Sequence, residues 1–317
     1  MTDIREPAVG GLDAAESAPR RRRWTPRRAV AAGVAVVVVL AVAAAVFVLR
    51  PSSAGSDEIT ADQRAAMRAA GNAVVDLISY RRASFDADYR RALAGTTGKL
   101  RSDMAAARKQ TLQTMDAGRF DLAARLDATA LVPAASGSGT NVLVVVSGWT
   151  VDNAGKRSAP KVERVQMTMT KVDGRWLAGN LRVPDGVLRD PSSGSEQDRV
   201  LTAATTCLAA MNTYDYHAVA AAKKRALACT SGPFTAHYAT SFDTVTAAAV
   251  KARTSQTFEV TGAGLQSLTS DTARLLVVGQ METTTNGKHP QYGLLSLTVT
   301  LHETDGAWKV TGYRTTP

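Results

Sequence analysis

Three patterns of hydrophobic and polar positions follow one another along the chain. Residues 29–49 form an unbroken run of uncharged residues rich in Val and Ala. Over residues 61–80 the larger apolar side chains recur three, four or seven positions apart, which predicts a helix buried along one stripe. Over residues 165–170 apolar and polar positions alternate, which predicts a strand with one dry and one wet face.

The helix pattern and the strand pattern both occur a second time, in the same order. Residues 91–100 recur as residues 225–234 with six of ten positions identical, an offset of 134. Each copy then continues through an apolar run, at 142–146 or 275–278, to an Asp-Gly-x-Trp element. The sequence therefore predicts a duplicated domain of about 120 residues, a size that can close its own core.

These patterns predict an α+β protein in which one transmembrane helix precedes two tandem domains. Each domain is expected to pack about three helices on an antiparallel sheet of about four strands. Asp173-Gly174 and Asp305-Gly306 are expected to form two-residue hairpin turns. The predicted segments are a disordered basic tail (1–28), the transmembrane helix (29–49), a short linker (50–59), the first domain (60–182), a Pro/Gly/Ser-containing linker (183–198) and the second domain (199–317).

The run at residues 29–49 is long enough, at about 1.5 Å per residue, to span a bilayer as a helix. Six arginines lie just before it, at positions 20–23, 27 and 28, and only Arg50 follows closely. This excess of basic residues predicts a cytoplasmic N-terminus and an extracytoplasmic location for both domains. The alternative is a cleaved signal peptide, but the run exceeds the usual apolar core of about 7–15 residues.

The positive charge of the chain, +10 in total, is concentrated in the first domain. Residues 60–182 carry a net charge of +8, whereas residues 183–317 are neutral. A basic domain beside a membrane favours anionic head groups or an acidic partner protein, and the candidate docking residues are Arg90, Arg91, Arg101 and Arg108. The alternative is an evenly charged, solvated surface. Nucleic acid is not expected as a partner, because the few aromatic residues are not interleaved with the basic ones.

The two cysteines, Cys207 and Cys229, both lie in the second copy, where the first copy has Ala73 and Gly95. The second copy has both cysteines and the first copy has neither, as expected if the two cysteines form a disulfide, since one cysteine alone could not form it. An oxidising compartment would permit the bond. Two buried free thiols are the alternative. Their spacing excludes a CxxC redox or zinc motif.

The tail, the apolar run and several stretches of the first copy resemble the actinobacterial Mce-associated membrane proteins. They are the Arg-rich tail and Ala/Val-rich anchor, residues 77–80 (LISY), 89–98 (YRRALAGTTG), 142–146 (VLVVV), 165–169 (VQMTM) and 174–177 (GRWL). The resemblance covers residues 20–182 and implies an NTF2-like (cystatin-like) cone, in which helices pack on a curved sheet. It also implies an accessory role beside Mce lipid-import complexes. The second copy departs from the single domain expected of that family.

The residues give little reason to expect an enzyme. Asp86 with Tyr89, and the run Tyr214, Asp215, Tyr216 and His217, are the candidates for acid–base chemistry in an apolar cone. Helix capping is the favoured role for Asp215. None of the four histidines has ligand spacing with an acid or cysteine, and there is no P-loop, dinucleotide fingerprint or nucleophile elbow. We therefore expect no catalytic residue, metal or cofactor.

The leading hypothesis is a single-pass, extracytoplasmic accessory protein of the cell envelope that supports an Mce-type lipid transport complex. Its expected partners are the membrane, the transporter subunits and lipid. The alternative is a protein that binds a small molecule or lipid, or an enzyme, using the apolar cone of one copy. A filled interior would favour the first hypothesis, whereas a roomy cavity with a convergent acid would favour the second. A third hypothesis is that the second copy only stabilises the first, sheet against sheet.

Overall fold

The computed structural model describes residues 58–133, 139–184, 195–288 and 290–316. Residues 53–317 form one compact unit. The predicted tail (1–28), the predicted transmembrane helix (29–49) and all but the last two residues of the predicted linker (50–59) lie outside the described residues. Among the residues that are described, no helix is long and apolar enough to cross a membrane.

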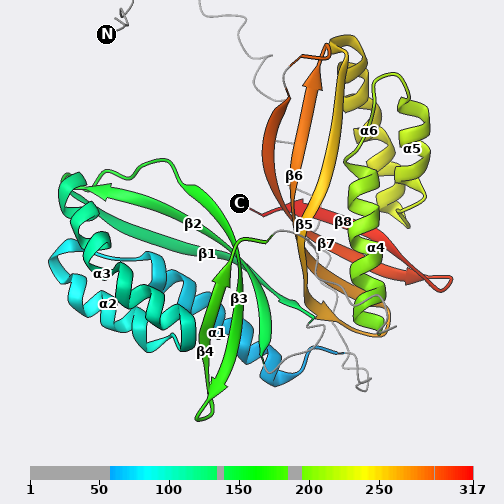
Figure 1. The fold of residues 1–317 in the computed structure, drawn as a ribbon. Coiled ribbons are helices and arrows are strands. Elements are labelled where there is room, and N and C mark those ends of the chain that lie inside the picture. The colour runs from blue at the N-terminus through cyan, green and yellow to red at the C-terminus, as the bar shows by residue number, and fades with distance from the viewer. Residues whose placement is uncertain (1–57, 134–138, 185–194, 289, 317) are drawn as a thin grey trace, which may run out of the picture. The chain divides into compact units, whose positions relative to one another are not determined.

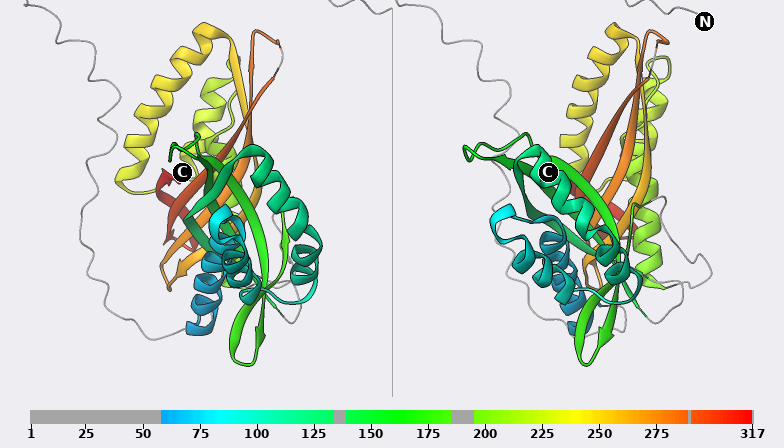
Figure 2. Two further views of the ribbon diagram at one scale, coloured as in Figure 1. Left: turned by 90° about the vertical axis from the view of Figure 1, so that its left-hand side faces the viewer. Right: turned by 60° about the vertical axis from the view of Figure 1, so that its left-hand side comes forward.

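The described residues form a mixed α+β fold in which the same order of elements occurs in both halves (Figure 1). Three helices come first, followed by four strands. The first half contains α1 (Ala61–Ile78), a short 3-10 helix (Arg82–Ser84), α2 (Phe85–Ala94), α3 (Gly98–Gly118), β1 (Phe120–Val132), β2 (Thr140–Asp152), β3 (Lys161–Val172) and β4 (Arg175–Arg182). The second half contains α4 (Glu196–Met211), α5 (Val219–Leu227), α6 (Pro233–Ala252), β5 (Thr254–Leu268), β6 (Thr272–Thr285), β7 (Gln291–Thr304) and β8 (Ala307–Thr315). Figure 2 shows α3 in teal and α6 in yellow as the long final helix of each half.

The eight strands form one antiparallel sheet in the order β4-β3-β2-β1-β5-β6-β7-β8. Within each half every strand pairs with its neighbour in sequence, as in a meander. The two halves are joined through β1 and β5, which are paired only at Leu131 and Leu265. The sheet is therefore two four-stranded meanders whose strand pairing is continuous through a single residue pair of β1 and β5.

Local sequence signals explain where these elements begin and turn. Thr60 and Gln63 form a capping box at α1, since each side chain accepts a hydrogen bond from the other residue's backbone N–H. Ser195 caps α4 by accepting from Asp198 N. For this reason α4 begins at Glu196, three residues before the predicted start of the second domain.

The two predicted Asp-Gly turns have the expected backbone. Asp173 and Gly174 have φ values of 48° and 77°, and Asp305 and Gly306 have φ values of 52° and 75°. Two consecutive positive φ values match the two-residue turn that fits the twist of a β-hairpin. These turns connect β3 to β4 and β7 to β8.

The prediction of one dry and one wet sheet face is wrong for parts of β3 and β7. Val142, Val144 and Val146 belong to the main core, which includes α1, whereas Leu143 and Val145 belong to a second cluster. That cluster combines residues of β1 and β2 with Leu276 and Val278 of β6. Side chains on the predicted wet face are buried as a result: Gln166 is 4%, Ser296 1% and Thr298 4% exposed. Parts of β2, β3, β6 and β7 are thus covered on both faces, because the faces remote from the helices contact each other.

Candidate functional site

A group of charged and aromatic side chains in the first half lies around α2. Phe85, Asp88, Tyr89 and Ala92 are spaced three and four apart and are all buried. This spacing places them on one face of the helix. Phe85 contacts Tyr80 and Tyr89, at ring-centroid distances of 5.5 and 5.9 Å. A charged residue on such a face requires partners, and Asp88 has them.

The carboxylate of Asp88 is 1% exposed and accepts hydrogen bonds from three residues. Arg81 donates from its backbone N (3.0 Å), Nε (3.1 Å) and Nη2 (2.9 Å). Arg91 donates from Nη1 (2.7 Å) and Ser84 from Oγ (3.0 Å). Hydrogen bonds from Arg81, and then from Arg91, hold the pKa of the Asp88 carboxyl far below its usual range. Asp88 is therefore held in its ionised form at neutral pH.

Three of the four candidate docking arginines are held by contacts within the first half. Arg91 also donates to Asp76 of α1 (2.8 Å), so that it links α1 to α2. Arg101 donates to the carbonyl oxygen of Leu93 (2.8 Å), which links α3 to α2. Arg108 pairs with Asp86 and lies over the rings of Phe85 and Tyr89. Arg90 is exposed, and the described residues offer it no ion pair.

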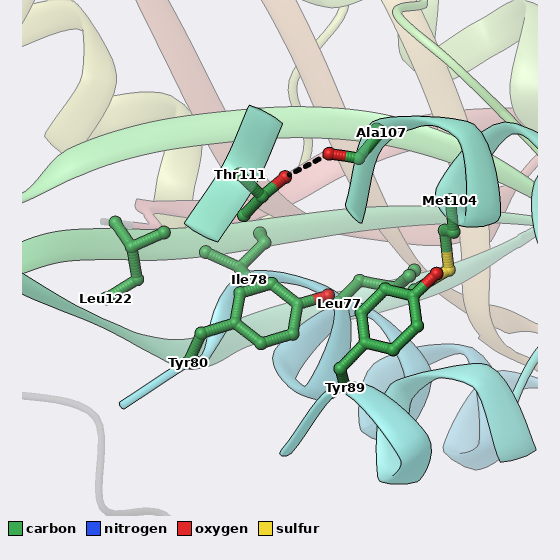
Figure 3. Close-up of a pocket in the computed structure, with 8 residues that line it drawn as sticks. All are labelled: Leu77, Ile78, Tyr80, Tyr89, Met104, Ala107, Thr111 and Leu122. Atoms are coloured by element: carbon green, nitrogen blue, oxygen red, sulfur yellow. Dashed lines mark hydrogen bonds between the residues drawn. The ribbon is translucent and has the colours of Figure 1, made fainter. Parts of the chain in front are cut away.

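A hollow opens next to this group, between α3 and the start of β1. It comprises two adjoining cavities of about 330 and 380 Å³, which share Ala107, Thr111 and Leu122. The first cavity is lined by Leu77, Ile78, Tyr80, Tyr89, Met104, Ala107, Thr111 and Leu122 (Figure 3). The second is lined by Ala107, Gln110, Thr111, Thr114, Met115, Phe120 and Leu122. No lining residue carries a carboxylate.

Two tyrosines supply the polar atoms at the inner wall of the first cavity. Burial raises the pKa of Tyr80 to about 12, so its phenol is neutral. Tyr89 is 7% exposed, and its hydroxyl is buried with no hydrogen-bond partner among the described residues. Figure 3 shows that hydroxyl beside the sulfur of Met104. The Thr111 hydroxyl, by contrast, donates to the Ala107 carbonyl oxygen (3.1 Å).

The candidate acid–base residues do not come together as a catalytic group. Asp86 is exposed and paired with Arg108, and so it does not contact the Tyr89 hydroxyl. In the second half, Asp215 accepts from His217 N and Ser255 Oγ and contacts His217 Nδ1. The hydrogen bond from His217 N lowers the pKa of Asp215. Asp215 thus stabilises a turn, although the residue that precedes α5 is Ala218 and not Asp215 as expected.

Cys207 of α4 and Cys229, which follows α5, are joined by a disulfide in the structure, with their Cα atoms 5.3 Å apart. The bond links two neighbouring helices of the second half. Among the described residues, no group of His, Cys, Asp and Glu side chains could hold a metal ion.

Sequence reasoning did not single out Asp88 or the hollow. A signal for both exists in the predicted duplication, because the offset of 134 places Ala222 opposite Asp88 and Tyr238 opposite Met104.

No family model matches the chain, and no curated protein matches it in sequence. Among solved structures, a periplasmic fragment of TraM is similar at 12% identity and a TM-score of 0.33, covering 38% of this chain and 96% of that chain. Agrobacterium tumefaciens VirB8 is similar at 13% identity and a TM-score of 0.31, covering 38% and 93%. An Ntf2-like protein involved in plasmid conjugation has 10% identity and a TM-score of 0.25, covering 79% and 95%. These values are too low to transfer a function to this chain.

Proposed function

We propose that the protein is a single-pass, extracytoplasmic accessory protein of the cell envelope with a duplicated NTF2-like ectodomain. In this proposal residues 29–49 anchor it, and residues 60–182 and 199–317 are the two domains. The first domain binds a protein partner, and by the resemblance of residues 20–182 that partner is a subunit of an Mce-type lipid transport complex. The protein acts by binding and is not an enzyme.

The observation that carries this proposal is the state of the acidic groups around α2. Asp88 is fixed in ion pairs and Asp86 is paired with Arg108. The adjoining hollow has no carboxylate among its lining residues. The groups that most often act as general bases, imidazole and carboxylate, are absent from the residues that line this hollow. An excess of positive charge, with Arg90 exposed on α2, favours electrostatic docking instead.

The contacts of the four arginines determine how docking should be tested. Reversing Arg91, Arg101 or Arg108 would break bonds that hold the helices together, so a loss of binding could reflect unfolding. Arg90→Glu changes the charge on the exposed side of α2 alone. Lys224→Glu is the matched control, because Lys224 occupies the equivalent exposed position of α5 in the neutral half.

The experiment is affinity purification of the full-length protein after crosslinking in its native membrane. We expect Mce-type transport subunits with wild type and with Lys224→Glu, and their loss with Arg90→Glu. Equal recovery with both variants would place the contact away from α2. Recovery of a different envelope complex would overturn the assignment to Mce transport, while recovery of no protein partner would overturn docking itself.

A further inference from the structure

The second half provides an internal reference for the hollow in the first half. Helices α3 and α6 match at both ends with the offset of 134: Gly98 and Gly232 have φ values of 53° and 61°, and Arg119 and Arg253 have φ values of 51° and 52°. Positions along the two helices can therefore be compared one by one.

In the second half, two large aromatic side chains of α6 occupy the space under the helix. Tyr238 and Phe242 are each 5% exposed and contact each other, with ring centroids 5.9 Å apart. The Tyr238 hydroxyl donates to the carbonyl oxygen of Met211 (2.6 Å), and Phe242 packs edge-on against Tyr214. Both residues belong to the main core.

In the first half the same two positions are Met104 and Arg108. Arg108 pairs with the exposed Asp86 rather than filling the core, and Met104 is only partly buried. An unbranched thioether takes up less space than a phenol ring and changes conformer easily. The substitutions of Tyr by Met and of Phe by Arg thus account for the hollow that α3 covers.

The polar group at this hollow is also particular to the first half. Tyr89 corresponds to Lys223, whose ammonium group pairs with Asp243. A buried hydroxyl without a partner costs free energy, and that cost is recovered when an acceptor reaches it. Every residue that lines the first cavity is uncharged, so the lining itself offers a charged ligand no ion pair in exchange for lost hydration.

We propose that this hollow is a binding site for a neutral, largely apolar molecule that carries one hydrogen-bond-accepting oxygen, a carbonyl or hydroxyl. The apolar part lies against Leu77, Ile78 and Leu122, and the oxygen accepts a hydrogen bond from the Tyr89 hydroxyl once Met104 has moved aside. The site does not depend on the docking proposal, because Arg90 is not among its lining residues.

The test uses photolabelling of the full-length protein in detergent with two probes. One is a long-chain aliphatic methyl ketone carrying a diazirine near its far end, and the other is the corresponding alkane with the same diazirine. Labelled residues are located by mass spectrometry. Partition of each probe into micelles is the same for all variants, so it cancels in comparisons between them.

With wild type we expect saturable labelling of α3 (Gly98–Gly118) and the start of β1. Met104→Tyr, which installs the residue of the second half, should abolish it for both probes. Tyr89→Phe should raise the half-saturating concentration of the ketone about 2- to 10-fold, the equivalent of one neutral hydrogen bond, without changing that of the alkane. The matched control is Tyr292→Phe, a change at a tyrosine that is 63% exposed. It should leave the half-saturating concentrations of both probes unchanged.

Tyr89→Phe also keeps the proposal testable if Met104→Tyr fails to fold. It removes an oxygen that has no partner, so the thermal midpoint of the variant should equal or exceed that of wild type. Labelling that does not saturate, or that spreads along the chain, would overturn the site. An equal effect of Tyr89→Phe on both probes would overturn the assignment of Tyr89 as the hydrogen-bond donor to the ligand.

Discussion

The ion pairs of Asp88 allow the most direct test of how the first half is stabilised. Asp88→Asn keeps the size of the side chain and removes its charge. Two of its three partners are partly exposed, since the side chains of Arg81 and Arg91 are 65% and 45% exposed. Both guanidinium groups can therefore regain water after the substitution, whereas the backbone N–H of Arg81 and the buried amide stay in place.

The expected loss follows from the hydrogen bonds that the amide cannot replace. Five donor groups point at the two carboxylate oxygens, and an amide NH₂ group cannot accept from those directed at its nitrogen. Hydrogen bonds to a charged group contribute roughly 1.5–3 kcal/mol each but are not additive, and breaking a fully buried ion pair costs about 3–5 kcal/mol. Because the arginines are rehydrated, we expect Asp88→Asn to lower the free energy of unfolding by about 2–4 kcal/mol at pH 7.

This contribution should depend on pH with a definite sign. The pKa of Asp88 is depressed in the folded protein, while an unfolded Asp has a pKa of about 3.9. The stabilisation is therefore complete above the unfolded pKa and is lost as the pH falls below about 4 toward the folded value. Wild type and Asp88→Asn should differ constantly from about pH 5 to pH 7 and converge below about pH 4.

The assay is urea denaturation of the full-length protein followed by circular dichroism. Asp243→Asn, which removes a carboxylate that is 58% exposed and paired with Lys223, is the matched control and should cost less than about 1 kcal/mol. A loss below about 1 kcal/mol for Asp88→Asn at pH 7, or a difference that does not shrink on acidification, would show that the ionised Asp88 carboxylate does not stabilise the first half.

Two further predictions concern the second half and the junction of the sheet. Reduction of the Cys207–Cys229 disulfide, which closes a sequence separation of 22, should cost about 3 kcal/mol in urea denaturation, and reductant should have no effect on the Cys207→Ala/Cys229→Ala variant. Gly264→Ala should cost about 1–3 kcal/mol, because its Cβ would lie 2.7 Å from the Leu131 carbonyl oxygen where β5 approaches β1. Gly312→Ala, whose Cβ meets nothing within 4 Å, should be close to neutral, and similar losses for both glycines would contradict the close approach.

Much of the order of elements could be read from local signals. The Asp-Gly pairs predicted their hairpins because positive φ at two successive positions is tolerated by very few residue pairs. The alternation at residues 165–170 predicted β3, and the Ala-rich stripe at residues 61–80 predicted α1. In contrast, β1 and β5 were not predicted as separate strands. Apolar and polar residues do not alternate regularly along Phe120–Val132 or Thr254–Leu268. Both strands have register shifts, which interrupt the period of two.

The candidate site was much less predictable than the fold. The four arginines were grouped by charge, yet three of them bind acidic side chains or a carbonyl oxygen within the first half. Their partners Asp76, Asp86 and Leu93 are brought near only when α1, α2 and α3 pack together. Charge in a sequence therefore did not distinguish a docking surface from internal ion pairs.

Local sequence was enough to predict part of the backbone pattern of each half, namely the two Asp-Gly turns and the alternation of apolar positions along β3 and β7. Turns and alternation depend on interactions between residues that are close in the chain. A short stretch of sequence therefore contains the information that predicts them. The burial of Gln166, Ser296 and Thr298, the pairing of Asp88 with two arginines and the hollow beneath α3 became visible in the folded structure and not in the sequence. Those properties depend on what packs opposite each side chain, and the residues involved are separated along the chain by as many as 132 positions, as are Arg164 and Ser296.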